Sequence, residues 1–188
     1  TLDPSDLGQI RMMLQSAGAW YTDAEGKVDV ADNQALKDAI NTYLKLVNSG
    51  VTKEAVGWDQ FVGAFNNGDV ASVPTGCWIS PSVKAAEDQS GLWAVAPFPR
   101  MAENAASVNA SSIGGAGWYV LQNVGDTDTA KDFLKNTFAS SVDLMNQLAE
   151  DINLVSTMNA AAEAENYKSG VEFYGGQAVF GDLATWQN

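Results

Sequence analysis

The side chains best suited to chemistry in this sequence are aromatic rings that stand beside glycines. Trp78 comes two residues after Gly76, and Trp20 and Tyr21 follow Gly18. Tyr174 and Gln177 flank Gly175 and Gly176, so that a ring, an amide and an accessible backbone occur together. Large rings presented at glycine-made bends are suited to stacking against a flat ligand, while nearby amides hydrogen-bond to its edge.

Nucleophilic and metal-dependent chemistry has little support in the sequence. Cys77 is the single cysteine and the chain has no histidine, which excludes an internal Cys/His dyad and zinc sites that contain histidine. The acidic turn from Asp23 to Gly26 has the wrong ligand positions for a calcium loop. We therefore expect neither a cofactor nor a metal.

The composition indicates a folded chain that does not bind nucleic acid. Apolar residues make up 46% of the 188 positions and charged residues 18%, which permits a sizeable core. Ten basic against 23 acidic residues give a net charge of −13, a poor match for nucleic-acid phosphates. No apolar run approaches the roughly 20 residues that span a bilayer.

Hydrophobic periodicity predicts several helices that must position these rings. The sequence predicts helices over 9–15, 33–49, 58–65, 82–88 and 179–186, and two further helices that begin at Thr127 or Asp128 and after Ser141. Asp32 or Asn33 is the expected N-cap of the longest helix, and Gly68 the expected left-handed stop after residue 65. Trp58, Trp93 and Trp186 lie in apolar periodic segments and are expected in the core.

Short apolar runs predict strands between these helices. They cover 70–73, 92–96 and 118–122, and a small hairpin is expected around residues 21–30. Alternating strands and helices indicate an α/β fold, although the strands are too few for a complete doubly wound sheet.

Eight motifs, in order along nearly the whole chain, resemble the family 1 extracellular solute-binding proteins, the maltose-binding-protein-like sugar receptors of ABC transporters. The motifs are Met12–Gly26, Leu36–Gly50, Phe65–Ala71, Thr75–Trp78, Gly91–Pro99, Gly114–Val120, Ala130–Leu134 and Phe173–Gln177. The resemblance implies a type II periplasmic-binding-protein-like fold, mostly lobe two with a crossover segment of lobe one.

The resemblance also implies a division into parts. Residues 1–112 would form the first part of lobe two, 113–154 the hinge crossover and a lobe-one segment, and 155–188 the truncated return to lobe two. Gly114 and Gly115 would supply the hinge, because lobes that close on a ligand need residues able to absorb backbone rotations.

By the same resemblance, the ligand is a sugar or oligosaccharide in a cleft between the lobes. Trp78 is the first stacking candidate. The other candidate ligand-binding residues are Trp20, Tyr21, Tyr174, Gly176, Gln177, Gln9, Arg11 and Trp118. The implied partners are carbohydrate and the transmembrane subunits of an ABC permease. The implied location is extracellular or periplasmic, with anchoring through a lipidation signal on a missing N-terminal segment.

Two other functions remain open at this stage. A carbohydrate-active enzyme could use paired carboxylates, but no such pair stands out near the aromatic candidates, and the expected function is not enzymatic. A surface-binding domain without a transport role would present a flat face in place of a cleft lined by Trp78 and Tyr174.

Overall fold

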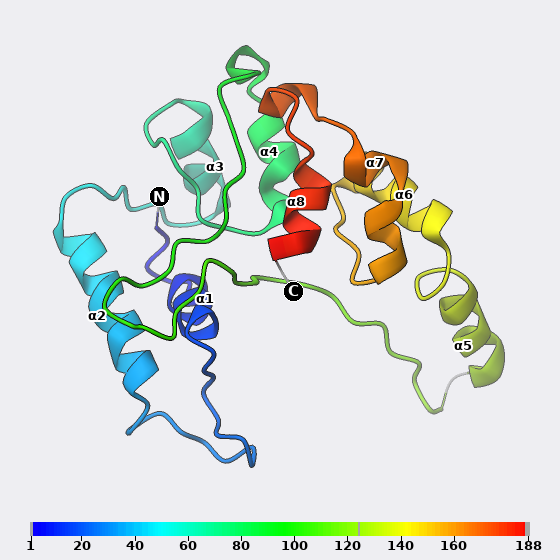
Figure 1. Cartoon of the computed structure of the whole chain (residues 1–188), viewed down its shortest axis with the longest axis horizontal. Coiled ribbons are helices and arrows are strands. Elements are labelled where there is room, and N and C mark those ends of the chain that lie inside the picture. Colours follow the sequence, from blue (N-terminus) through cyan, green and yellow to red (C-terminus); the bar gives the residue numbers. More distant parts are fainter. Residues whose placement is uncertain (1, 124, 187–188) are drawn as a thin grey trace. The chain divides into compact units, whose positions relative to one another are not determined.

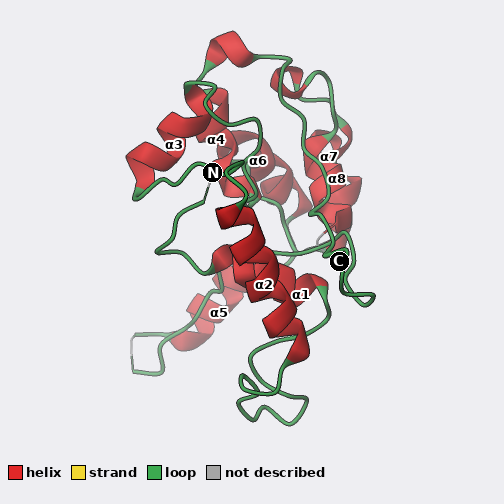
Figure 2. Cartoon of the chain, turned by 90° about the vertical axis from the view of Figure 1, so that its left-hand side faces the viewer, coloured by secondary structure: helices red, strands yellow, loops and turns green. Residues whose placement is uncertain are grey.

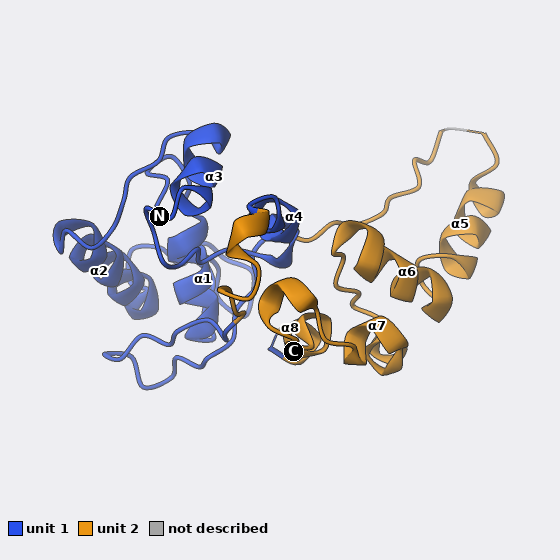
Figure 3. Ribbon diagram, turned by 90° about the horizontal axis from the view of Figure 1, so that it is seen from above, with its two compact units in different colours: residues 1–86, 96–113, 186–188 blue, residues 87–95, 114–185 orange. Residues whose placement is uncertain are grey.

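A computed structural model describes residues 2–123 and 125–186 of the chain. The chain divides into two compact units, which are coloured separately in Figure 3. Unit 1 contains residues 1–86, 96–113 and 186–188, and unit 2 contains residues 87–95 and 114–185. Each unit has its own core.

Unit 1 is built on helices, and most of them lie where the sequence predicts. The helices are α1 (Gly8–Ser16), α2 (Gln34–Asn48), α3 (Trp58–Asn66) and α4 (Ser80–Lys84), with a 3₁₀ turn at Cys77–Ile79. The first two lie side by side (Figure 1). The helix expected over 82–88 is instead α4 followed by a separate 3₁₀ turn at Glu87–Gln89.

Local signals fix the ends of these helices. The side chain of Asn33 accepts a hydrogen bond from the backbone N–H of Leu36 at 3.0 Å, which caps the N-terminus of α2. Gly68 has a φ of +74°, a conformation that glycine adopts without the steric penalty other residues meet, and α3 has ended two residues earlier. Both sequence predictions are confirmed.

The core of unit 1 lies between α1, α2 and the segment around Met101. Met13, Ala17, Ala39 and Met101 form one buried cluster. A buried hydrogen bond of 2.8 Å between the hydroxyls of Ser16 and Ser107 ties this segment to α1. The N-terminal half of the unit is thereby joined to residues 96–113.

Within its described residues, unit 2 contains four helices, and the last three of them contribute buried side chains to a second core. The four helices are α5 (Thr127–Asn136), α6 (Val142–Ile152), α7 (Glu165–Lys168) and α8 (Val179–Trp186), with 3₁₀ turns at Asn159–Glu163 and Glu172–Tyr174. The buried cluster consists of Met145, Ala149, Ala161, Tyr167, Phe180 and Ala184. The phenol oxygen of Tyr167 accepts the N–H of Ser156 at 2.9 Å, so its one polar group is satisfied inside this core.

The N-caps in unit 2 correct one prediction and confirm another. Asp126, not Thr127 or Asp128, caps α5, because its carboxylate accepts the backbone N–H groups of both Asp128 and Thr129. Ser141 caps α6 as expected, accepting the N–H of Leu144 at 3.2 Å.

The predicted strands are wrong for the described part of the chain. Residues 70–73, 92–96 and 118–122 form no strand there, and Figure 2 shows helices joined by loops. Only isolated bridges occur among the described residues: Leu2 with Glu54, Thr22 with Val28, and Val171 with Gln177. The Thr22–Val28 bridge confirms the small hairpin. A strand exists only where a neighbour completes its backbone hydrogen bonds, and these runs find no such neighbour within their units.

Candidate functional site

Trp78 and Trp58 form a pair of stacked indoles on the surface of unit 1. Their ring centroids lie 5.9 Å apart with an interplanar angle of 29°. Trp78 is 44% exposed and Trp58 is 52% exposed, so both rings present apolar area to solvent. Indole is among the side chains that proteins bury most readily, and a stacked pair left half-exposed is suited to receive a flat ligand.

The sequence prediction for Trp58 is wrong. Trp58 was expected in the core because it lies in an apolar periodic segment. Phe65 is fully buried and Phe61 meets it edge-on, with ring centroids 6.0 Å apart. Trp58 begins α3 and lies beyond the part of this helix that the core covers, so its indole remains accessible.

The N-terminus of α1 lies against the turn that carries Trp78. The side-chain amide of Gln9 donates to the carbonyl of Pro74 at 2.5 Å. Arg11 lies on the same helix and is half-buried. The structure thus brings Gln9 close to the turn that carries Trp78. We call Gln9, Pro74, Gly76, Trp78, Ile113 and Trp58 the Trp78 corner.

Trp20 and Tyr21 lie past the other end of α1. Their ring centroids lie 5.1 Å apart with an interplanar angle of 56°, and Trp20 is 42% exposed. The Asn33 side chain donates to the Trp20 carbonyl at 2.7 Å, which fixes the backbone there. A nine-residue helix is about 13 Å long, so these rings belong to a different part of unit 1 from the Trp78 corner.

In unit 2, Tyr174, Gly176 and Gln177 belong to one tight turn. Val171 and Gln177 are bridged, and the Tyr174 side chain is buried with 7% of its area exposed. The amide of Gln177 accepts the N–H of Val95 at 2.8 Å and donates to the Val95 carbonyl at 2.8 Å. It also donates to the Asp182 carboxylate at 2.8 Å. The amide therefore takes the place of a neighbouring strand for Val95.

Replacing Gln177 with methionine is expected to loosen residues 87–95 from unit 2. The change removes three hydrogen bonds at nearly constant volume, and the expected loss is about 1–3 kcal/mol of unfolding free energy. Urea denaturation measures it, and hydrogen exchange at the Val95 amide should accelerate. Gln147→Met is the matched control, since Gln147 makes one exposed bond to Asp151. Equal effects of the two changes would contradict the strand-like role of Gln177.

Gly114, Gly115 and Trp118 lie where the chain enters unit 2. Trp118 stacks on Phe138 with centroids 4.6 Å apart and is 64% exposed. Gly114 and Gly115 have φ values of +91° and +99°, and the boundary between the units falls immediately before Gly114. A residue with a Cβ would be strained at either position.

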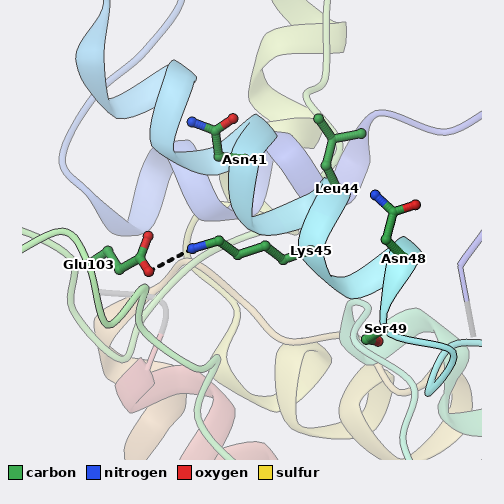
Figure 4. A pocket seen from close by; sticks show the side chains of 6 residues that line it. All are labelled: Asn41, Leu44, Lys45, Asn48, Ser49 and Glu103. Carbon is green, nitrogen blue, oxygen red and sulfur yellow. Dashed lines mark hydrogen bonds and ion pairs between the residues drawn. The ribbon is translucent and has the colours of Figure 1, made fainter.

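An open cavity of about 530 Å³ lies on α2, and none of the candidate residues lines it. Figure 4 shows the side chains that line it: Asn41, Leu44, Lys45, Asn48, Ser49 and Glu103. Lys45 and Glu103 point toward each other and form an ion pair of 2.6 Å. Both side chains are largely exposed, and such surface pairs contribute little to stability.

Local donors lower the pKa of three carboxyl groups. The Ser5 hydroxyl lowers the pKa of Asp3, the Thr129 hydroxyl that of Asp126, and Lys168 that of Glu163 by hydrogen bonding and charge. Each group therefore stays ionised to lower pH than a free carboxyl group. Asp3 accepts hydrogen bonds in a turn, Asp126 caps a helix, and Glu163 forms an ion pair with Lys168.

Comparison with known proteins places this geometry in context. Residues 3–174 match the family model described as bacterial extracellular solute-binding protein. The chain is 38% identical over 185 residues to a protein named lactose-binding protein from Rhizobium radiobacter. The match covers 98% of this chain and 44% of that protein, so the chain spans less than half the length of this relative. No solved structure matches the chain.

Across residues 2–123 and 125–186, none of the helices has the length and apolar character needed to cross a membrane.

Proposed function

Because the chain belongs to the bacterial extracellular solute-binding proteins, we propose that it serves as part of the sugar receptor of an ABC importer. Membership of this family implies a periplasmic-binding-protein-like fold and a place outside the cytoplasm. Proteins of this family generally bind solutes without catalysing a reaction. The permease subunits that would receive the sugar, and a lipid anchor on an N-terminal segment, are part of the proposal.

The observation that carries the proposal is the stacked, half-exposed pair Trp58 and Trp78. A pyranose ring has an apolar face that covers an indole and a rim of hydroxyls that needs hydrogen-bonding groups. Two adjacent indoles provide area for more than one sugar ring. Lactose is our proposed ligand, because the relative named for lactose binding matches nearly the whole chain.

The hydroxyl rim would be met by the polar candidates. Gln9 lies at the Trp78 corner through its bond to Pro74, and Arg11 follows it on α1. Trp20, Tyr21, Trp118 and the turn containing Tyr174, Gly176 and Gln177 are proposed as further contacts in the closed, ligand-bound form. Gln177 would contribute through the turn that it stabilises, since its own amide is engaged with Val95 and Asp182.

The proposed lobes follow the division expected from the sequence: 1–112 in lobe two, 113–154 as the crossover, and 155–188 returning to lobe two. The compact units agree with this division in their boundary after residue 113 and differ from it in keeping 155–185 together with 114–154. The positive φ values of Gly114 and Gly115, together with the unit boundary beside them, support their role as the hinge. Hinges of closing lobes are a few residues able to absorb large backbone rotations.

Isothermal titration of the full-length protein with lactose tests the proposal. We expect saturable binding with one site per chain, and weaker binding of galactose or glucose because each fills only part of the platform. Failure to bind any sugar in a panel of mono- and disaccharides, together with binding of a peptide or a metal, would overturn the proposal. Release of galactose and glucose from lactose during the titration would instead indicate an enzyme.

A further inference from the structure

Gly76 occupies a backbone conformation that does not require glycine. Its φ of −84° and ψ of 170° are ordinary extended values that any residue adopts. The reason for glycine at this position must therefore lie in its surroundings.

A side chain at residue 76 would collide with its neighbours in the Trp78 corner. A Cβ built there would lie 2.6 Å from Nε1 of Trp78, 2.7 Å from its Cδ1 and 2.7 Å from the carbonyl oxygen of Ile113. Non-bonded heavy atoms pack best at about 3.5–4.0 Å, so both the indole and the Ile113 carbonyl would be too close to this Cβ.

The indole is the neighbour that can move furthest, whereas the Ile113 carbonyl can yield only by a shift of its backbone. The colliding atom of Ile113 belongs to the backbone, and the Ile113 side chain in turn contacts the start of α1, because a Cβ at Gly8 would lie 2.5 Å from Ile113 Cδ1. Helix α1 itself is anchored by buried Met12, Met13 and Leu14. Trp78, by contrast, is 44% exposed and can rotate toward solvent. Rotation would separate it from Trp58.

We propose that Gly76 is a positioning residue for Trp78: the missing Cβ lets the indole lie against residue 76 and holds it stacked on Trp58. Ile113 forms the opposite wall of this slot. Gly76 thereby sets the orientation of the surface to which the sugar binds. The effect on sugar binding rests on the proposed function, whereas the orientation of the Trp78 ring by Gly76 does not depend on it.

The substitution Gly76→Ala tests the ring geometry directly. Stacked indoles couple their transitions, so far-ultraviolet circular dichroism contains a contribution from the pair, which Trp58→Phe isolates by removing one indole. We expect Gly76→Ala to reduce this contribution and to weaken lactose binding about tenfold, as loss of one oriented aromatic contact would. Unchanged dichroism and unchanged affinity would overturn the proposal.

Gly63→Ala is the matched control. It is the same substitution on neighbouring α3, and its Cβ would meet only the Nδ2 of Asn67 at 3.8 Å, an ordinary contact. We expect this variant to keep both the dichroism of the pair and the lactose affinity. An equal loss in Gly63→Ala would contradict a specific role for Gly76.

A double-mutant cycle distinguishes positioning from general structural damage. If Gly76 acts mainly through the indole, Gly76→Ala costs much less lactose affinity in the Trp78→Ala background than in the unaltered protein. An equal loss in both backgrounds would show that residue 76 acts through Ile113 or the fold, and the proposal would fail. Should Gly76→Ala not fold, NMR of the unaltered protein decides: a nuclear Overhauser effect between Gly76 Hα and Trp78 Hδ1 supports the slot, and its absence overturns it. A protein that binds no sugar but shows this effect would refute the proposed function alone.

Discussion

Replacing Trp78 with alanine is expected to weaken sugar binding about a hundredfold. The indole supplies stacking area and forms a pair with Trp58, 5.9 Å away. Loss of a central aromatic contact from an interface costs about 2–4 kcal/mol, and 2.7 kcal/mol corresponds to a factor of one hundred. Isothermal titration of the variant measures the change.

Trp93→Phe is the control for this prediction. Trp93 lies in unit 2, and its indole N–H donates to Gln89 at 2.6 Å. Its replacement is expected to leave the sugar affinity within about twofold. If Trp78→Ala bound sugar as tightly as the unaltered protein, the stacking platform would have to be abandoned.

Replacing Phe65 with alanine is expected to lower the unfolding free energy by about 3–5 kcal/mol. Phe65 is fully buried at the end of α3 and meets Phe61 edge-on at 6.0 Å. The substitution leaves a cavity that the surrounding helices fill only in part, and the loss is a large fraction of an ordinary domain's stability. Urea denaturation followed by circular dichroism measures it.

Phe133→Ala provides the comparison for Phe65. Phe133 is 60% exposed on α5, so its removal should change the unfolding free energy by no more than about 1 kcal/mol. Similar losses for the two variants would mean that Phe65 does not lie in a cooperative core.

The helices could be predicted from the sequence because their signals are local. The apolar spacing in 33–49 and the Asn33 cap specify α2, and Ser141 specifies the start of α6. Asp126 was missed as the cap of α5 because three neighbouring residues, Asp126 to Asp128, are all capable caps. The residue whose carboxylate reaches two N–H groups is decided by the backbone geometry.

The strands could not be predicted with equal success because they depend on distant partners. Residues 92–96 have the apolar character of a strand, yet Leu92 is 78% exposed, and Val95 is bonded by the Gln177 side chain in place of a strand. Residues 118–122 are similarly apolar, but Trp118 and Tyr119 are 64% and 88% exposed. Propensity shows that a segment suits a sheet, and pairing decides whether it enters one.

Only part of the candidate site could be predicted from the sequence, because the rest depends on contacts between distant residues. Trp78 could be selected because glycine beside a large ring is visible in the sequence. Trp58 was missed, since periodicity shows only that the segment of α3 is apolar and cannot show which of its side chains the core covers. The role of Gly76 depends on Ile113, which is 37 positions away, and only the structure brings the two together.

The most direct test of the sugar platform is NMR of the indole N–H groups during titration of the full-length protein with the disaccharide. Stacking of a sugar on Trp58 and Trp78 predicts large, saturable changes in the chemical shifts of these two indole N–H groups. The resonance of the Trp93 indole is expected to stay unchanged. Saturable binding that leaves the resonances of Trp58 and Trp78 unmoved would contradict the assignment of these rings as the binding surface.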